Sequence, residues 1–537
     1  MKNYLLIALL LIIIGQNVAA QNQDLVKQKV DSVKDFREFK VLDSKYIDKN
    51  ALWAPFNVDL NGFSEETYEV LKPLILEQNI PTLQKNMAQG KLTYEKLVLF
   101  YLYRIRKFDR ENKLSLNAVI ALNPNVVAEA RQKDKQQKPA NEFSVFGMPI
   151  LLKDNINAAG MPTTAGAVAL QNNLAEDAFI VKQLKNNGAL ILGKANLSEW
   201  AYFFCGDCPS GYSAMGGQTL NPYGRRIFDT GGSSSGSGAA VAANFCVAAV
   251  GSETSGSILS PSSQNSVVGL KPTVGLLSRT GIIPISSTLD TPGPMTKNVI
   301  DNAIMLEAMM GFDKEDSASV KLDSEPFGNL ENPSLKGKRF GAFKGLMEDS
   351  LYVEALSKLK NEGAEIIEIE QEKIDLPGFI RLLNLDMKND LPEYLHKHAN
   401  ASIALKSVED VMEFNRKDSL KSAPYGQALF KGIVADKGNS EDLESIKDTL
   451  SANGKLFFET PMKMHNLDGI LSINNFHAGF AAVAKYPALT VPMGYQTDGK
   501  PRGLTFIAKP FQEKSLLQWA IVYEQVSNKR SAPKSYN

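Results

Sequence analysis

The sequence predicts an α/β fold in which helices pack on a largely parallel or mixed β-sheet. Segments with helical and with strand-like patterns alternate along the chain, and the same alternation recurs in its first and second halves. Such alternation places helices on the faces of a sheet whose strands are buried. The chain shows no regular internal repeat.

The first half of the chain supplies one series of elements. Ile80–Met87, closed by Gly90, has the spacing of a short amphipathic helix, and Thr93 is a candidate cap for the next one. The elements expected after it are a helix at Tyr94–Phe108, a strand at Asn117–Asn123, a helix at Val126–Gln137, a strand at Val145–Leu152, a helix from Ala178 to Leu184 with Gly188 as its C-cap, and a strand at Ala189–Leu192. The strand at Val145–Leu152 delivers Lys153 at its end.

The second half repeats the pattern. Its expected elements are a strand at Lys338–Phe343, a helix at Tyr352–Asn361 ending at Gly363, strands at Glu365–Ile369, Ala488–Met493 and Gly503–Ala508, and a closing amphipathic helix at Ser515–Lys529. Residues 375–455 between them are more polar and helical, and we expect them to cover the core as a cap.

The composition is that of a globular protein. Of the 537 residues, 44% are hydrophobic and 22% are charged, which is ample for a large core. Basic and acidic residues both number 59, so the formal net charge is zero. This balance gives no indication of a nucleic-acid partner. The sequence does not determine the oligomeric state.

The N-terminus has the pattern of a secretory signal peptide over residues 1–20. Lys2 precedes the apolar run Tyr4–Ile14, and a short series of small residues ends at Ala20. An uncleaved membrane anchor is the alternative, but the apolar run is too short to cross a bilayer comfortably. We therefore expect an exported protein, periplasmic or secreted, that is cleaved near Ala20 and keeps no stable membrane anchor. The sequence pattern assigns no secondary structure to residues 21–60.

Three cysteines are too few for a disulfide framework in an exported chain. Cys205 and Cys208 form a C-x-x-C motif, which predicts either a local disulfide or two ordinary thiols. A metal site would need further ligands nearby in the sequence. Cys246 lies in an apolar run and is expected in the core.

Two turns of small residues enclose an apolar run in the middle of the chain. Gly231–Gly238 reads GGSSSGSG, Ala239–Val250 is the apolar run, and Glu253–Ile258 reads ETSGSI. Glycine lets the backbone adopt positive φ or approach a ligand closely, and consecutive N–H groups in such turns can bind an anion. A flexible linker would share the Gly and Ser content, but it would not enclose such an apolar run.

These turns and their flanks resemble the amidase signature family. The family motifs occur in order as GMPILLKD at Gly147–Asp154, GGSSSGS from Gly231, TSGSI from Thr254 and VGLKPT from Val268. These motifs in the right order, with matching flanks, make this resemblance specific.

The resemblance covers roughly residue 80 to the C-terminus. It implies a single α/β/α domain at residues 61–537 around a large mixed β-sheet, with the signature core at about 140–300. Residues 375–455 resemble the family least, and they would form a variable helical cap over the substrate entrance.

The resemblance also implies a Ser-Ser-Lys triad. Ser257 would be the nucleophile, Ser233 a bridging serine held by a cis peptide bond after Gly232, and Lys153 the general base. The oxyanion hole would consist of backbone N–H groups, those of Thr254, Ser255, Gly256 and Ser257. No cofactor and no metal are implied.

Lysine acts as a base only when it is neutral. A pKa near 10.4 leaves about one lysine in 2,500 neutral at pH 7, and burial lowers the pKa by roughly 3–5 units. The apolar run Ile150–Leu152 indicates that Lys153 is buried. Asp154 would oppose a low pKa if it faced the amine, but successive side chains on a strand point to opposite faces.

A second interpretation uses histidine. Residues 232–236 also match the G-x-S-x-G motif, in which Ser234 would be the nucleophile of a Ser-His-Asp esterase, with His465 or His477 as its base. That motif should follow a hydrophobic strand directly, whereas Asn221–Thr230 is a polar loop. The chain has only four histidines, which favours lysine as the base.

The function expected from the resemblance is an exported amidase that hydrolyses carboxamide C–N bonds through an acyl-enzyme on Ser257. The segments Ser278–Ser286 and Asp290–Met295 are most similar to bacterial peptide amidases, which implies a small-molecule or peptide amide substrate, such as a C-terminal peptide amide. An aryl- or fatty-acyl-amide hydrolase and an amidotransferase subunit remain the alternatives within the family. Ser255 and Leu259 depart from the glycine and arginine that many members have there.

Overall fold

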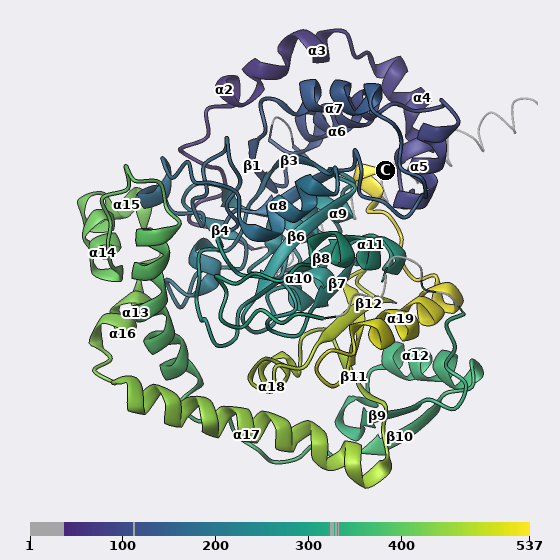
Figure 1. Cartoon of the computed structure of the whole chain (residues 1–537), viewed down its shortest axis with the longest axis vertical. Coiled ribbons are helices and arrows are strands. Elements are labelled where there is room, and N and C mark those ends of the chain that lie inside the picture. Colours follow the sequence, from purple (N-terminus) through teal and green to yellow (C-terminus); the bar gives the residue numbers. More distant parts are fainter. Residues whose placement is uncertain (1–36, 111–112, 323–326, 328–329, 331) are drawn as a thin grey trace, which may run out of the picture. The chain divides into compact units, whose positions relative to one another are not determined.

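One mixed β-sheet forms the centre of the protein (Figure 1). The structure is a computed structural model, and it describes residues 37–110, 113–322, 327, 330 and 332–537. Residues Lys40–Asn537 cluster as one unit, which carries every element named below. The predicted signal peptide, residues 1–20, lies outside the described residues.

Eleven strands of the described residues make up this sheet. In spatial order they are β1 (Val119–Leu122), β3 (Leu190–Ala195), β2 (Pro149–Lys153), β6 (Ala248–Glu253), β8 (Thr291–Thr296), β7 (Val268–Lys271), β12 (Ala488–Tyr495), β13 (Pro501–Ile507), β11 (Gly469–Ile473), β9 (Arg339–Phe343) and β10 (Glu365–Ile369). The pairs β3–β2, β2–β6, β11–β9 and β9–β10 are parallel, and the other neighbours are antiparallel. A short hairpin, β4 (Tyr212–Ser213) and β5 (Gly217–Gln218), lies outside this sheet.

Helices surround the sheet. Those before and within the signature region are α2 (Lys49–Trp53), α3 (Asn57–Asn61), α4 (Glu65–Ile75), α5 (Ile80–Ala88), α6 (Tyr94–Phe108), α7 (Val126–Lys135), α8 (Phe179–Asn186), α9 (Ser235–Ala242), α10 (Leu259–Gln264) and α11 (Val299–Met309). The later helices are α12 (Ser350–Asn361), α13 (Phe379–Lys397), α14 (Val408–Lys417), α15 (Ser419–Ser422), α16 (Ala428–Ala435), α17 (Ser440–His465), α18 (Ala478–Val483) and α19 (Glu513–Ser527). Short 3₁₀ turns occur at Ala54–Phe56, Val168–Leu170, Glu199–Tyr202, Lys344–Leu346 and Lys534–Tyr536.

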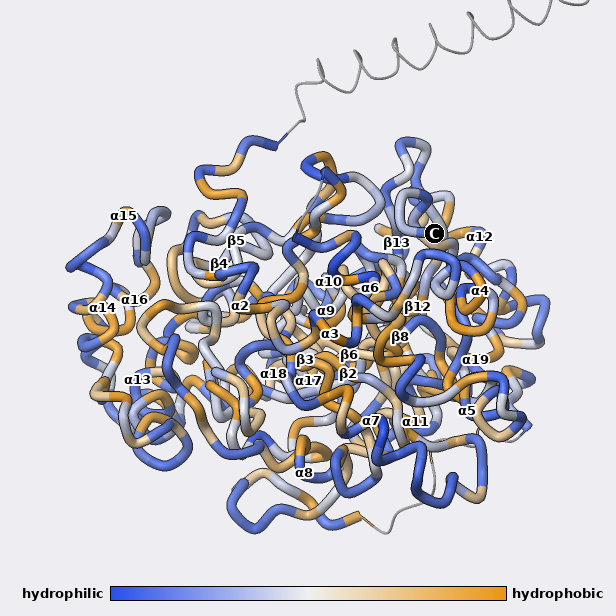
Figure 2. The backbone as a smooth tube through the Cα atoms, turned by 90° about the horizontal axis from the view of Figure 1, so that it is seen from above, coloured by the Kyte–Doolittle hydropathy of each residue, from blue (hydrophilic) through white to orange (hydrophobic). Residues whose placement is uncertain are grey.

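The middle of the sheet is fully buried. Every residue of β2, β3 and β6 is buried, because helices cover strands that run parallel to one another. Figure 2 shows hydrophobic segments gathered around these strands and hydrophilic ones toward the periphery. The core therefore extends through the layer that carries the signature turns.

The predicted α/β class is confirmed, and so are most of its elements. Thr93 caps α6 by accepting a hydrogen bond from the backbone N–H of Lys96. The strand expected at Glu365–Ile369 is β10 with the same bounds. The closing helix is amphipathic as expected, since Leu516 and Trp519 of α19 are buried and Ile521 is half-buried.

Several expected boundaries differ from those of the structure, most of all the start of one strand. The strand expected from Val145 begins only at Pro149, because Gly147 adopts φ +71° in a turn closed by the hydrogen bond from Met148 N to Val145 O. Part of the unplaced segment 21–60 is helical, since it contains α2 and most of α3.

Residues 375–455, expected to be helical, contain α13 to α16 and most of α17. Figure 1 shows these green helices gathered on one side of the sheet, with α17 running toward β9 and β10.

Cys205 and Cys208 form a disulfide, and the neighbouring Phe204 accepts a hydrogen bond from Leu429 N of α16. Cys246 is buried, as predicted. No helix among the described residues has both the length and the apolar character needed to cross a membrane.

Candidate active site

Lys153 lies at the carboxyl end of β2 and is completely buried. Its Nζ is 2.7 Å from Ser233 Oγ and 2.9 Å from both the carbonyl oxygen and the Oγ of Ser252. The sheet explains this meeting, because β2 and β6 are parallel neighbours whose carboxyl ends share one edge. Three oxygen atoms therefore surround the amine.

Burial lowers the pKa of Lys153 to about 7, against the opposing influence of the carboxylates of Asp290 and Glu253. A pKa of this size leaves roughly half of the amine neutral at pH 7. The expected burial of this lysine is therefore found in the structure.

Asp154 does not face this amine. Its Oδ1 lies 3.1 Å from the Nζ of Lys194, and its Oδ2 accepts a hydrogen bond from Thr164 N at 3.1 Å. The carboxylate is thus engaged elsewhere, as the alternation of side chains along a strand predicts.

Ser233 is buried just before α9, and its peptide bond with Gly232 is cis. Its carbonyl oxygen accepts a hydrogen bond from Ser198 N at 3.0 Å, while its hydroxyl contacts Lys153. The cis bond is the one that the resemblance implied.

Ser257 lies in the turn between β6 and α10 and is 9% exposed. A hydrogen bond from Ser234 N to the carbonyl oxygen of Ser257, 3.1 Å long, joins this turn to the segment that carries Ser233. The Ser257 hydroxyl itself makes no hydrogen bond within the described part of the chain. The structure thus places Lys153 and Ser233 in direct contact and holds Ser257 nearby through the backbone.

Four consecutive N–H groups in this turn are free. Within the described residues, none of those at Thr254, Ser255, Gly256 and Ser257 donates a hydrogen bond. Glu253 fixes the far side of the turn, because its Oε2 accepts from the N–H groups of Ile258 at 2.7 Å and Leu259 at 3.0 Å. The arrangement presents several backbone donors to a developing oxyanion.

The structure accommodates Ser255 and Leu259, the two residues that depart from the family pattern. Gly256 has φ +85°, whereas Ser255 is not among the residues with positive φ, so a side chain at Ser255 introduces no strain. Leu259 is buried at the start of α10 in an apolar cluster that includes Phe343 and Ile470. An apolar side chain therefore fits the surroundings of this position.

Ser252 and Asn155 are site residues that the sequence reasoning missed. The Oγ of Ser252 accepts from Lys153 and also from the Nδ2 of Asn155, 2.9 Å away. The one available signal was the position of Ser252 at the end of an apolar strand, five residues before Ser257. Neither residue type is distinctive there.

The structure does not support Ser234 as a nucleophile. Its hydroxyl donates to Ser252 O at 3.1 Å and accepts from Ser252 N at 3.2 Å, so β6 satisfies it. The Nδ1 of His477 contacts Ser472 Oγ at 2.6 Å, and burial lowers the pKa of this histidine to about 4. His465 is the last residue of α17.

A cavity of about 170 Å³ adjoins the site. Ser252, Asn155 and Thr254 line one side of it, and Asp390 and Tyr394 of α13 line another. The cap helix therefore forms part of the wall of this cavity.

Comparisons with known proteins show the family of this chain. Residues 96–443 match the family model described as Amidase. The chain is 36% identical over 485 residues to a probable amidase of Arabidopsis thaliana, with 86% of this chain and 92% of that protein covered.

Two solved structures are also similar to this chain. One is an amidase family protein from Bacillus anthracis, with a TM-score of 0.86 and 37% identity, covering 92% of this chain and 99% of that one. The other is a peptide amidase from Stenotrophomonas maltophilia, with a TM-score of 0.80 and 37% identity, covering 85% of this chain and 98% of that one. The chain therefore belongs to the amidase signature family and is an enzyme that acts on carbon–nitrogen bonds.

Proposed function

We propose that the protein hydrolyses carboxamides through an acyl-enzyme on Ser257, with Ser233 as proton relay and Lys153 as general base. The observation that carries this proposal is the 2.7 Å contact between Lys153 Nζ and Ser233 Oγ in a fully buried setting. A serine hydroxyl needs such a base within hydrogen-bond reach to become a nucleophile.

The contacts of Lys153 indicate where its lone pair points. A neutral amine has two N–H groups and one lone pair, and the carbonyl oxygen of Ser252 can only accept a hydrogen bond. If the second N–H donates to Ser252 Oγ, the lone pair faces Ser233 and accepts the proton of its hydroxyl. Ser233 would then draw the proton of Ser257 as Ser257 attacks the substrate.

The remaining steps follow from the same groups. As Ser257 Oγ bonds to the amide carbon, the carbonyl oxygen becomes an anion facing the free N–H groups of the turn Thr254–Ser257. The C–N bond then breaks, and the proton held by Lys153 returns through Ser233 to the leaving nitrogen. Water attacks the acyl-enzyme by the same route and releases the carboxylic acid and Ser257.

For the substrate, we propose a peptide with a C-terminal amide. The similar Stenotrophomonas maltophilia protein is described as a peptide amidase, and the cavity beside Ser252 offers room for a substrate group. We also propose that the protein is exported, on the strength of the sequence pattern in residues 1–20.

The test measures ammonia release from peptide amides, with simple aliphatic amides and esters alongside. We expect peptide amides to be hydrolysed, Ser257→Ala to remove turnover, and Ser234→Ala to retain it. Ester turnover without release of ammonia from any amide would contradict the proposal. So would activity in Ser257→Ala together with its loss in Ser234→Ala.

A further inference from the structure

The cavity beside the active site is strongly acidic. Five carboxylates line it, those of Asp290, Glu315, Asp316, Asp390 and Glu393, whereas Arg279 is the one arginine or lysine among its described lining residues. The charge of Arg279 is committed to Asp316, since its Nε donates to Asp316 Oδ2 at 2.9 Å and its guanidinium also reaches Oδ1. Glu393 is paired outside the cavity, 2.6 Å from the Nζ of Lys397. The remaining carboxylates still leave the cavity a negative charge that its own arginine does not balance.

Asp290 and Asp390 are wall carboxylates held by backbone N–H groups rather than by an ion pair with Arg279. Asp290 accepts from the N–H groups of Ile285 at 2.8 Å and Ser286 at 2.9 Å, and from the hydroxyl of Thr254. Asp390 accepts from the N–H of Ser287 at 2.6 Å. Neither carboxylate forms a salt bridge within the part of the chain that the structure describes.

The charge of Asp390 lacks compensation. Burial, and next the neighbouring carboxylate of Asp386, raise the pKa of Asp390 to about 7. Both causes disfavour a negative charge at this position, and a cation bound nearby would relieve both.

Asn155 provides an independent indication of a ligand. It is 2% exposed, lines the same cavity and uses its Nδ2 to bond Ser252 Oγ and the carbonyl oxygen of Ile283. Because the carbonyl oxygen of Ile283 can only accept a hydrogen bond, the amide is oriented with Nδ2 toward it. Its Oδ1 then has no hydrogen-bond partner among the described residues. A buried acceptor without a partner is costly, so a ligand with N–H donors would satisfy it.

We propose that this cavity binds a cationic group of the amide substrate, an ammonium or guanidinium, so that the enzyme prefers peptide amides bearing a positive charge. The inference rests on the proposed function and specifies its substrate class. An organic cation fits better than a metal ion, because the described residues contain no group of three or more carboxylate, histidine or cysteine side chains arranged to hold one. Ser252 and Thr254 join the cavity to the reacting centre, so a group bound there is part of substrate recognition.

The test compares matched substrates that differ by one charge. Acetyl-lysinamide is paired with acetyl-norleucinamide, acetyl-ornithinamide with acetyl-norvalinamide, and a dipeptide amide with its N-acetylated form. Together the three pairs place an ammonium at different distances from the amide. We expect the cationic member to have the higher kcat/KM, by about tenfold or more, in at least one pair.

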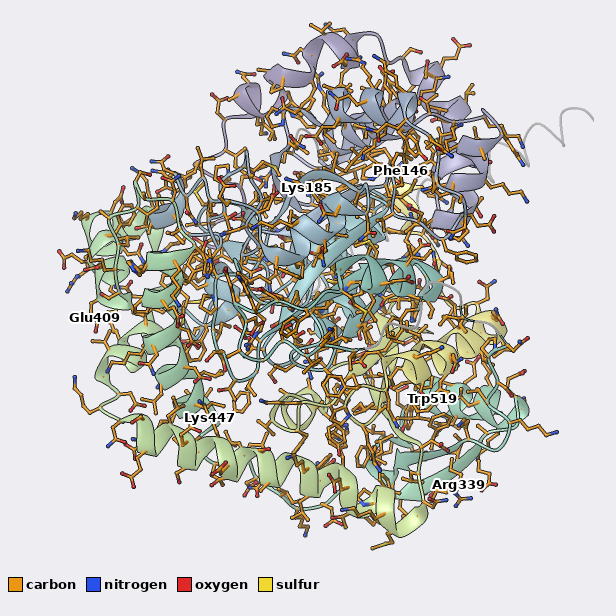
Figure 3. All side chains as sticks on the ribbon, viewed as in Figure 1. Phe146, Lys185, Arg339, Glu409, Lys447 and Trp519 are labelled. Carbon is orange, nitrogen blue, oxygen red and sulfur yellow. A yellow bond between two sulfur atoms is a disulfide. The ribbon has the colours of Figure 1, made fainter. Side chains whose placement is uncertain are left out.

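Asp390→Asn keeps the shape of the side chain and removes its charge, and it should reduce that preference by about tenfold. Glu409→Gln is the matched control, because it removes a carboxylate from α14 of the cap, where Glu409 is exposed at the margin of the view (Figure 3). It should keep the wild-type preference. Since the preference is a ratio measured within one variant, partial loss of folded enzyme cancels.

Equal or lower kcat/KM for the cationic member of every pair would overturn the inference while leaving the proposed amidase function intact. An unchanged preference in Asp390→Asn would also overturn it. No ammonia from either member of any pair would instead contradict the proposed function, and this inference with it.

Discussion

The amine of Lys153 lies 2.7 Å from the hydroxyl of Ser233, although 80 residues separate them in the chain. The lysine lies at the carboxyl end of β2, and the serine lies in the segment before α9. Ser252 contacts the same amine with its carbonyl oxygen and with its hydroxyl, each 2.9 Å from Nζ. The amine is therefore held independently of Ser233, and substitution can remove the two hydroxyl contacts separately.

Ser252→Ala should lower kcat by about 10- to 100-fold with a smaller effect on KM. The substitution removes the hydroxyl that accepts from Lys153 and from Asn155, while it leaves the backbone carbonyl contact in place. Ser252→Thr retains a hydroxyl and should restore most of the activity. Steady-state kinetics on one neutral peptide amide measures both variants. Full activity in Ser252→Ala would show that the hydroxyl does not help to position the amine.

Glu253→Ala should lower both kcat and stability. The Glu253 carboxylate accepts the N–H groups of Ile258 and Leu259, so its loss leaves two buried donors unpaired beside the turn that carries Ser257. We expect a loss of about 1–3 kcal/mol in the free energy of unfolding and about tenfold or more in kcat. Urea unfolding and ammonia release measure these quantities.

Glu253→Gln is the control for that variant. Its side-chain oxygen can still accept from both N–H groups, so it should be affected less than Glu253→Ala. Equal losses in the two variants would show that the negative charge, rather than the hydrogen bonds, holds the turn.

Lys153→Met should be inactive. Its stability relative to the wild-type protein should increase as pH falls from about 10 to 7. The pKa of Lys153 is lowered from 10.5 to about 7, so the unfolded chain binds its proton more readily than the folded protein does. The wild-type protein therefore loses stability as pH falls through this range, by up to about 5 kcal/mol before lost hydrogen bonds are considered. Below about pH 7 the difference should level off.

Unfolding temperatures of the two proteins, measured in parallel across this range, check that prediction. Taking the difference cancels the other titrating groups. A difference that is constant with pH would contradict a lowered pKa for Lys153.

Much of the fold could be predicted from the sequence. The elements with clear periodicity or caps, such as α6 after Thr93 and β10, lie where the pattern placed them. The sequence reasoning assigned no structure to β6, β7, β8 and α9. Gly, Ser and Ala make up most of β6 and α9, and β8 contains two prolines, so neither a helical nor a strand period is visible there. Burial in the sheet decides their conformation, and burial is a property of the whole fold.

The candidate site was predictable only where a motif marked it. Lys153, Ser233 and Ser257 stand in recognisable sequences, and the structure brings the first two into contact. Ser252, Asn155 and Asp390 carry no such mark, because their roles come from neighbours more than 30 residues away in the chain. The Asp390 side chain, for example, meets Ser287 N only because α13 packs beside the segment that follows β7.

The pH dependence of kcat/KM tests the central claim most directly, since a base must lose its proton before it acts. It should be measured on a neutral peptide amide in wild-type enzyme and in Asp390→Asn, because the pKa of Asp390 is also raised to about 7. We predict that kcat/KM rises with pH and levels off above an inflection at about 7 in both proteins, and that Lys153→Ala lowers it by about a thousandfold or more. A profile that is flat from about pH 6 to 9, or an inflection that disappears in Asp390→Asn, would contradict a neutral Lys153 as the base.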